Sequence, residues 1–136
     1  MTDAPRFSFN RGIAILRCRQ PFYDWLMALE PKPDASLTLA DLQRDNEGFL
    51  IPGDPTIQGY DDAVRWIEKR WRMLFEHMLM DWVIYEDLWP QKRTLKMFRE
   101  WFEIVYSEMA WDLVDEPLEA EDSEDEDFES GSPWLH

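Results

Sequence analysis

The acidic residues of this chain are concentrated near its C-terminal end, and this limits what the chain can fold into. Residues 115–129 contain ten acids and no base, whereas residues 1–114 contain 19 acids and 14 bases. A segment with so many like charges and so few apolar side chains cannot bury enough surface to fold. With 136 residues in all, we expect one folded domain over residues 1–117 and a disordered acidic tail over residues 118–136.

The remaining composition indicates a packed core. Hydrophobic residues make up 45% of the chain and aromatic residues 15%, including eight Trp and eight Phe. No apolar run approaches the roughly 20 residues that span a bilayer, and residues 1–10 lack the apolar region of a signal peptide. A lone cysteine excludes an internal disulfide and any multi-cysteine zinc site. We therefore expect a cytoplasmic protein that has no membrane contact.

Two short strands are predicted in the first half of the chain. Residues 7–18 predict a strand, and the run from Ile13 to Leu16 is apolar on both faces, which is typical of a central strand. Gly12 indicates a bulge or a close backbone approach. Residues 48–53 predict the second strand. Because a helix is expected between the two, both a parallel crossover and an antiparallel return remain open.

Two short helices are predicted beside these strands. Pro21 suits the first turn of a helix that Pro31 terminates. Thr38 is placed to cap a second helix over residues 39–44.

The second half of the chain shows a helical period. From residue 61 to about residue 85 one apolar stripe recurs every three or four residues. Its members are Val64, Ile67, Trp71, Leu74, Phe75, Met78 and Trp82. Thr94 is placed to cap a last helix, whose stripe is Leu95, Phe98, Trp101, Phe102, Val105, Met109 and Leu113. Two long helices joined by a short break predict an antiparallel helical hairpin.

The predicted fold class is therefore α+β, with a small sheet of two or three strands packed on a long C-terminal helical hairpin. Residues 109–114 leave an alternative, in which they depart from the helix and add a strand. The helical spacing continues through Leu113 and favours the helix. Six aromatic residues should form one cluster between the paired helices: Trp71, Phe75, Trp82, Phe98, Trp101 and Phe102.

Three segments resemble a family of small uncharacterised bacterial proteins. They are Asn10-Arg11, the run Arg19-Gln20-Pro21-Phe22-Tyr23-Asp24-Trp25, and Phe98-Arg99-Glu100-Trp101-Phe102, with an acidic tail after them. The resemblance covers most of residues 9–118. It implies a bacterial, cytoplasmic setting and confers no particular activity.

The sequence assigns no catalytic residue, cofactor or metal site. Cys18 falls in a strand that is apolar on both sides, where a buried thiol has a raised pKa and little reactivity. His77 and Asp81 are four residues apart and share a helical face, so we expect them to pair. A di-metal helix bundle would need a Glu three residues before the histidine, and position 74 is Leu74.

Seven basic residues form a candidate patch near one end of the predicted hairpin. They are Arg65, Lys69, Arg72, Lys92, Arg93, Lys96 and Arg99. Glu68 and Glu76 interleave with the first three, and the net charge of -15 opposes phosphate binding. The pattern favours a salt-bridged surface, and we expect no nucleic-acid partner.

A second apolar stripe on the predicted long helix is the candidate partner-binding surface. At 100° per residue, Trp66, Met73, Met80 and Ile84 lie nearly opposite the main stripe. The sheet and the short helices could cover it. Otherwise it would bind a protein partner or a second copy of the chain, since Trp and Met are enriched at such surfaces.

These features predict a non-enzymatic protein-interaction or regulatory module. A toxin-neutralising or nucleic-acid-mimicking protein is one form of it, because dense negative charge speeds association with basic partners. One alternative is a small enzyme of unknown reaction with a cleft between the sheet and the hairpin. The other is a nucleic-acid-binding regulator that uses the basic patch. A concave pocket with buried ionisable groups would favour the enzyme, and a flat apolar surface would favour interaction.

Overall fold

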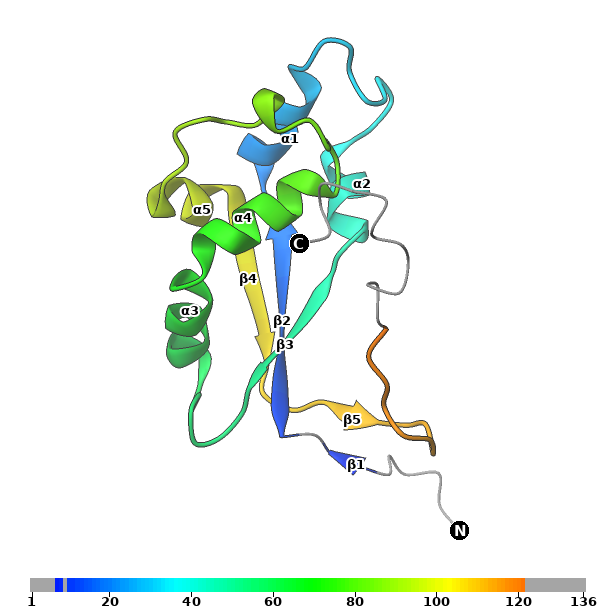
Figure 1. The fold of residues 1–136 in the computed structure, drawn as a ribbon, viewed down its shortest axis with the longest axis vertical. Helices are drawn as coiled ribbons and strands as arrows, with labels where there is room; N and C mark the ends of the chain where they lie inside the picture. The colour runs from blue at the N-terminus through cyan, green and yellow to red at the C-terminus, as the bar shows by residue number, and fades with distance from the viewer. Residues whose placement is uncertain (1–6, 9, 122–136) are drawn as a thin grey trace.

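A computed structural model describes residues 7–8 and 10–121 and shows an α+β fold (Figure 1). In chain order its elements are β1 (Phe7–Ser8), β2 (Arg11–Cys18), α1 (Gln20–Met27), α2 (Leu39–Arg44), β3 (Gly48–Pro52), α3 (Tyr60–Glu68), α4 (Trp71–Met80), the 3₁₀ helix η1 (Glu86–Leu88), α5 (Leu95–Trp101), β4 (Phe102–Ser107) and β5 (Trp111–Asp112). The predicted acidic tail lies outside the described residues beyond residue 121. Within the described part of the chain, no helix has the length and apolar character needed to cross a membrane.

The main sheet has three antiparallel strands in the order β3-β2-β4. The prediction that β2 is central is confirmed, and of the two connections left open the chain takes the antiparallel return. Ala14 on β2 pairs with Phe49 on β3 and with Tyr106 on β4, which fixes the register across the sheet. The strands β1 and β5 form a separate antiparallel pair, which lies beyond the lower end of the main sheet in Figure 1.

Gly12 permits the close backbone approach that its position predicts. A Cβ atom at this residue would lie 3.0 Å from the carbonyl oxygen of Ser107 and 3.1 Å from the ring of Tyr106. Only a residue without a side chain lets β2 and β4 pair at this distance.

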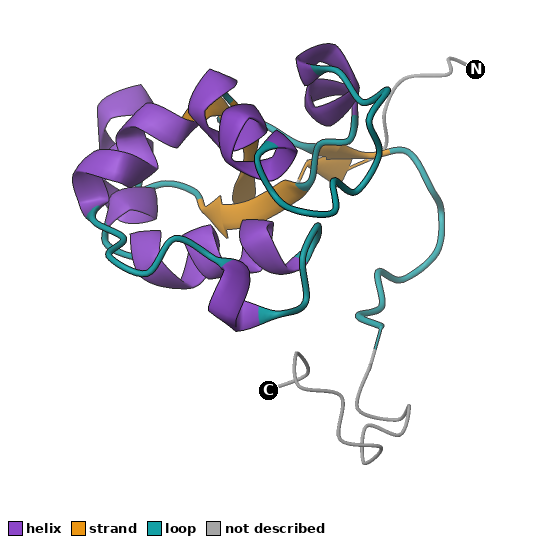
Figure 2. Cartoon of the chain, turned by 90° about the horizontal axis from the view of Figure 1, so that it is seen from above, coloured by secondary structure: helices purple, strands orange, loops and turns teal. Residues whose placement is uncertain are grey.

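The two short helices of the first half form as predicted. Pro21 occupies the first turn of α1, and Phe22 and Leu26 are buried on its inner face. The Thr38 hydroxyl accepts a hydrogen bond from the backbone N–H of Asp41, whose side chain in turn accepts one from the backbone N–H of Thr38. This reciprocal capping box satisfies two N–H groups that the start of α2 would otherwise leave unpaired. Seen from above, the helices gather around the strands (Figure 2).

The predicted single helix over residues 61–85 is wrong, because the chain forms α3 and α4 with a break at residues 69–70. The Arg70 backbone leaves the helical region, and its guanidinium donates a hydrogen bond to the carbonyl oxygen of Trp66. Ile67 before the break and Leu74 after it are both buried. Seven residues make close to two helical turns, so the apolar period continues across the break and does not reveal it.

The predicted helical hairpin is also wrong. The last helix ends at Trp101, and the chain continues directly as β4. The core side of β4 carries Phe102, Ile104 and Tyr106, and these alternate with more polar or more exposed residues. Aromatic and β-branched side chains of this kind favour a strand. Every residue of β4 pairs with a residue of β2, and this pairing stabilises the strand over the helix that the spacing of apolar residues predicts. The alternative for residues 109–114 is closer to the structure, since Trp111–Asp112 forms β5.

The core lies between the helices and one face of the sheet. Phe75 is its aromatic centre, with ring centroids 5.3 Å from Trp101 and Phe102 and 6.2 Å from Phe98. Four of the six residues of the predicted aromatic cluster, Phe75, Phe98, Trp101 and Phe102, therefore lie together, and they join α4 to α5 and β4. Trp71 and Trp82 are half-buried at its margin.

Candidate functional site

Three potential metal-ligating side chains meet where α4 ends. His77 is on α4, Asp81 follows its last residue, and Glu47 directly precedes β3. The His77 Nε2 and Glu47 Oε1 atoms are 2.5 Å apart, at hydrogen-bond distance. One ligand atom from each of the three residues lies within 4.8 Å of the others.

Two members of this cluster, Glu47 and Asp81, line a hollow of about 270 Å³. Its polar lining consists of Asp45, Glu47 and Asp81, and its apolar lining of Leu16, Cys18, Leu42, Met78 and Trp82. The ring of Phe49 packs edge-on against His77 at a centroid distance of 5.6 Å, which supports the imidazole from the sheet side. The site therefore combines a carboxylate-rich rim with an apolar floor.

The Asp81 carboxyl group is the most perturbed acid at this site, with its pKa raised to about 6. Partial burial is the largest cause, followed by a hydrogen bond and charge repulsion from Glu47, and Asp45 adds to the rise. The charge of His77 acts in the opposite direction. A carboxyl group that titrates near neutral pH is common at functional sites, and it also arises wherever acids are crowded together.

Cys18 lies in the floor of the same hollow and is 3% exposed. Burial, and then the nearby Asp81 charge, raises the pKa of its thiol to about 12. The prediction of a buried cysteine is thus confirmed, and its thiol stays protonated at neutral pH.

Sequence reasoning found two members of this cluster and missed the third. The helical spacing placed His77 and Asp81 on one face, but the hydrogen-bond partner of His77 is Glu47, 30 residues earlier. No local pattern links Glu47 to α4. A charged residue directly before a predicted strand was the only signal available.

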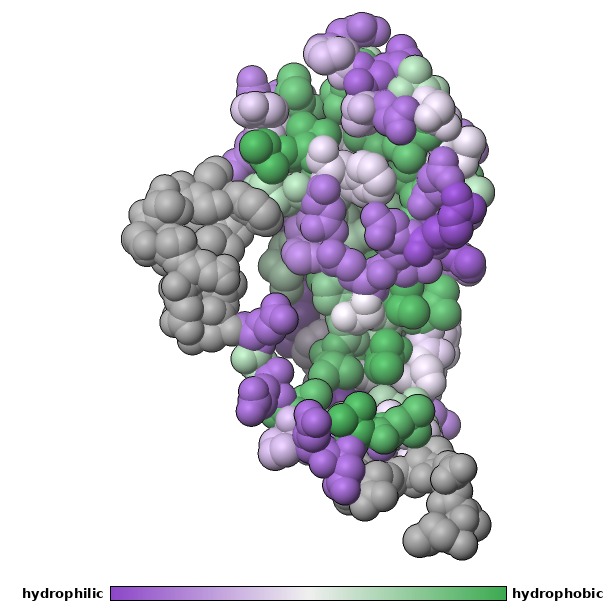
Figure 3. Space-filling view, turned by 90° about the vertical axis from the view of Figure 1, so that its right-hand side faces the viewer, coloured by the Kyte–Doolittle hydropathy of each residue, from purple (hydrophilic) through white to green (hydrophobic). Residues whose placement is uncertain are grey.

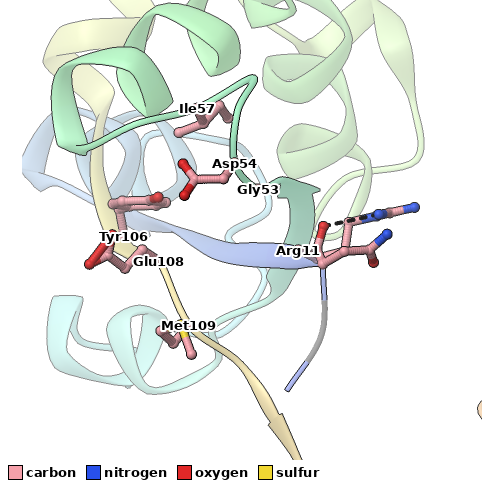
Figure 4. A pocket seen from close by; sticks show the side chains of 8 residues that line it. Arg11, Gly53, Asp54, Ile57, Tyr106, Glu108 and Met109 are labelled. Atoms are coloured by element: carbon pink, nitrogen blue, oxygen red, sulfur yellow. Dashed lines mark hydrogen bonds between the residues drawn. The ribbon is translucent and has the colours of Figure 1, made fainter. Parts of the chain in front are cut away.

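A second hollow, of about 230 Å³, lies at the opposite end of the sheet (Figure 4). Asp54 and Ile57 reach it from the loop after β3, and Tyr106 and Glu108 from β4 and the residue beyond it. Burial, followed by the charges of Glu108, Asp54 and Asp62, raises the pKa of the Tyr106 hydroxyl. The Tyr106 hydroxyl can donate a hydrogen bond to a ligand in this hollow.

Three of the seven residues of the predicted basic patch form ion pairs in the structure, and a fourth lies against an aromatic ring. Arg65 pairs with Asp62, and Arg93 pairs with Glu76. Arg99 donates two 2.9 Å hydrogen bonds to the carboxylate of Glu68. The guanidinium of Arg72 lies 4.9 Å from the centre of the Trp71 ring. Glu68 and Glu76, the acids that interleave with the patch in the sequence, supply two of these three ion pairs.

The predicted partner-binding stripe does not form one continuous line, because its helix is broken. Trp66 is on α3 and is half-buried under the Arg70 guanidinium, which lies 3.5 Å from its ring centre. Met73 and Met80 are on α4, where Met73 is exposed and Met80 packs against the core. Ile84 follows α4 and is exposed. Only Met73 and Ile84 therefore present substantial apolar surface.

The structure reveals instead an apolar sheet face that sequence reasoning missed. Alternate residues of β2 (Ala14, Leu16 and Cys18) are buried in the core, and the residues between them face the other way. We define the open face by four side chains: Ile13 and Ile15 on β2, Leu50 on β3 and Val105 on β4. Leu50 is 51% exposed and Val105 39%, and none of the four belongs to the core or packs against it.

Further apolar side chains continue beyond the end of β4. Met109, Trp111, Leu113 and Val114 are all at least half exposed. Figure 3 shows one side of the molecule, where a belt of hydrophilic side chains crosses the middle and hydrophobic ones gather below it. Exposed apolar side chains therefore gather in the lower part of this face of the molecule (Figure 3).

Comparisons with protein-family models, with curated proteins and with solved structures found no match for this chain.

Proposed function

We propose that this protein is a non-enzymatic interaction module that binds a basic protein through the open face of its sheet. The observation that carries the proposal is the apolar open face formed by Ile13, Ile15, Leu50 and Val105. Register pairing sets Ile13 beside Leu50, and Ile15 beside Val105, so the four side chains form one contiguous patch across all three strands.

The structure of this face suits a partner surface. Apolar centres with charged rims are typical of protein interfaces. Arg17 and Glu103 form a 3.8 Å ion pair at one end of the open face, where both side chains are almost half exposed. A partner would therefore meet an apolar centre bordered by polar groups, supplied by a rigid sheet.

Charge favours a basic partner over a second copy of the chain. The net charge of -15 makes two copies repel each other, whereas it attracts a positive protein over a long range. The residues after 114 carry most of this excess charge and would increase the association rate without contributing to the fit of the interface. Dense negative charge of this kind is compatible with a toxin-neutralising or nucleic-acid-mimicking role.

The test uses a tagged full-length chain to isolate its partner from its own cells at low salt. The affinity of the purified partner is then measured for the parent and for a double variant, Leu50→Thr with Val105→Thr. These substitutions remove apolar surface, keep the preference for a strand and leave the charge unchanged. We expect a loss of affinity of about tenfold or more, because central apolar contacts dominate interface energies.

Met73→Gln is the matched control, because Met73 is also an exposed apolar residue but belongs to the predicted stripe on α4. It should leave the affinity unchanged. If Met73→Gln abolished binding of the partner and the double variant kept it, the interface would lie on that stripe and not on the open face. Light scattering tests whether the open face binds a second copy of the chain. A dimeric parent together with a monomeric double variant would show that it does.

The contribution of the acidic residues is tested by ending the chain after Leu118, which leaves 21 acids and 14 bases. We expect slower association with the basic partner and a weaker dependence of the rate on salt, with little change in dissociation. Tight binding of DNA or RNA by the shortened chain would favour the basic-patch alternative.

A further inference from the structure

We propose that Glu47, His77 and Asp81 form a binding site for a first-row divalent transition-metal cation, with Zn²⁺ the best fit to the donor set. The site is independent of the open face of the sheet. Two of its three residues, Glu47 and Asp81, line the hollow between α4, β2 and the segment that joins α2 to β3.

The ligand types point to the class of cation. One imidazole nitrogen and two carboxylate oxygens form a mixed donor set. Imidazole favours Zn²⁺ and its first-row neighbours, whereas Mg²⁺ and Ca²⁺ prefer oxygen ligands alone. Three protein ligands also leave a coordination position for water, as in open zinc sites.

The distances allow the three groups to reach one ion. Ligands about 2.0–2.2 Å from Zn²⁺ in tetrahedral geometry lie about 3.3 Å from one another. The donor atoms now lie within 4.8 Å of one another, and the His77 and Glu47 pair is closer than a metal site needs, at 2.5 Å. Both of these side chains are about two-fifths exposed, which leaves them room to rotate toward the spacing that an ion requires.

The position of the residues along the chain preorganises the site. His77 and Asp81 are held one helical turn apart, with Asp81 at the C-terminal cap of α4. Glu47 is fixed by the start of β3, which pairs with the central strand. A bound cation would therefore link α4 to the sheet edge.

The local charge also favours a cation. Asp45, Glu47 and Asp81 all line the hollow, and none of the lining residues in the described chain is basic. A bound cation would offset the repulsion between the Glu47 and Asp81 carboxylates, whose oxygen atoms lie within 4.8 Å of one another. The edge-to-face contact of the Phe49 ring with the His77 ring, at a centroid distance of 5.6 Å, restricts the orientation of the imidazole.

The experiment titrates the metal-free full-length chain with Zn²⁺ by calorimetry, and with Co²⁺ by visible absorption spectroscopy. We expect one Zn²⁺ per chain above any weak background binding. The visible spectrum should show the absorption bands that Co²⁺ gives when it has a low coordination number. Glu47→Gln, His77→Gln and Asp81→Asn should each weaken Zn²⁺ binding at least about tenfold, because each removes one of three ligands.

The controls address the other acids and the second histidine of the chain. Glu30→Gln removes an exposed carboxylate, and His136→Gln removes the histidine outside the described residues. Both should bind Zn²⁺ as the parent does. Far-UV circular dichroism of every variant checks that it is folded, and the exposed positions of Glu47 and His77 make unfolding an unexpected outcome.

The proposal is overturned if the parent shows no stoichiometric Zn²⁺ binding. It is equally overturned if folded Glu47→Gln and His77→Gln variants bind Zn²⁺ as tightly as the parent, since the acids of residues 115–129 would then hold the metal.

Discussion

The indole N–H of Trp89 donates a 2.7 Å hydrogen bond to the carbonyl oxygen of Val83, and both residues are buried. This bond closes the segment between α4 and α5 into a loop that includes η1. The guanidinium of Arg93 lies 5.6 Å from the Trp89 ring and donates a further hydrogen bond to the carbonyl oxygen of Pro90. Trp89 is thus the anchor by which an otherwise exposed connection is held against the core.

Replacing Trp89 by Phe should lower the free energy of unfolding by about 1–3 kcal/mol, because it leaves the Val83 carbonyl oxygen buried without a donor. Urea denaturation measures the change. Trp111→Phe is the matched control, since Trp111 is half exposed on β5 and should give almost no effect. Equal effects of the two substitutions would contradict the anchoring role of Trp89.

Gly12→Ala should destabilise the protein by about 1–3 kcal/mol, since the added methyl group meets backbone that must shift. The added Cβ atom would lie 3.0 Å from the carbonyl oxygen of Ser107. Ser107 is in β4, which pairs with β2. Thermal or urea denaturation measures the loss.

Gly48→Ala provides the comparison within the same sheet. A Cβ atom at Gly48 meets only side-chain atoms at 3.5 Å or more, which is an ordinary contact. The reduced freedom of the unfolded chain should make this variant as stable as the parent, or more stable by up to about 1 kcal/mol. If Gly12→Ala behaves in the same way, β2 and β4 are not paired as closely as described.

Phe75→Ala should be the most damaging single truncation in the core, at about 3–5 kcal/mol. Phe75 is fully buried and contacts the rings of Phe98, Trp101 and Phe102. Trp71→Ala should cost clearly less, because Trp71 is only half-buried. Equal losses would indicate that α4 packs with a different face toward the core.

Local signals in the sequence predicted the first half of the fold well. Thr38 and Pro21 define helix starts through their own backbone and side-chain chemistry, and this chemistry acts within a few residues. The apolar run of β2 predicted burial on both faces and hence a central strand. The central position is correct, because β3 and β4 flank β2, but only one face of β2 is covered by the core.

The second half could not be predicted from periodicity alone. Phe98, Phe102 and Val105 fit a helical stripe, and Phe102, Ile104 and Tyr106 equally fit an alternating strand. The choice depends on pairing with residues 13–18, almost 90 positions earlier in the chain. The break before Trp71 is hidden for a related reason, since buried positions recur on both sides of it in the same helical phase.

The candidate metal site shows the same division between local and distant information. His77 and Asp81 were recognisable as neighbours because a helix places residues i and i+4 on one face. Glu47 joins them only after the sheet and α4 have packed together. The open face was hidden as well, because Ile13 and Ile15 were expected to be covered.

The last prediction concerns the dependence of stability on pH at Asp81. Its pKa is raised from 3.8 to about 6 in the folded protein, so between these values the folded state binds more protons than the unfolded state. Stability from this group is therefore fully present below about pH 4 and is lost as the pH rises through about 6. Glu47, His77 and Asp45 face the same carboxyl group and set this shift.

Asp81→Asn removes this dependence while keeping the size and polarity of the side chain. The stability of the variant relative to the parent should therefore increase between pH 4 and pH 7, measured by urea denaturation of both proteins in the presence of a chelator. Contributions from the other acids are shared by the two proteins and largely cancel in the difference. A difference that stays constant with pH, or that moves in favour of the parent as the pH rises, would show that Asp81 is not held in an environment that disfavours its charge.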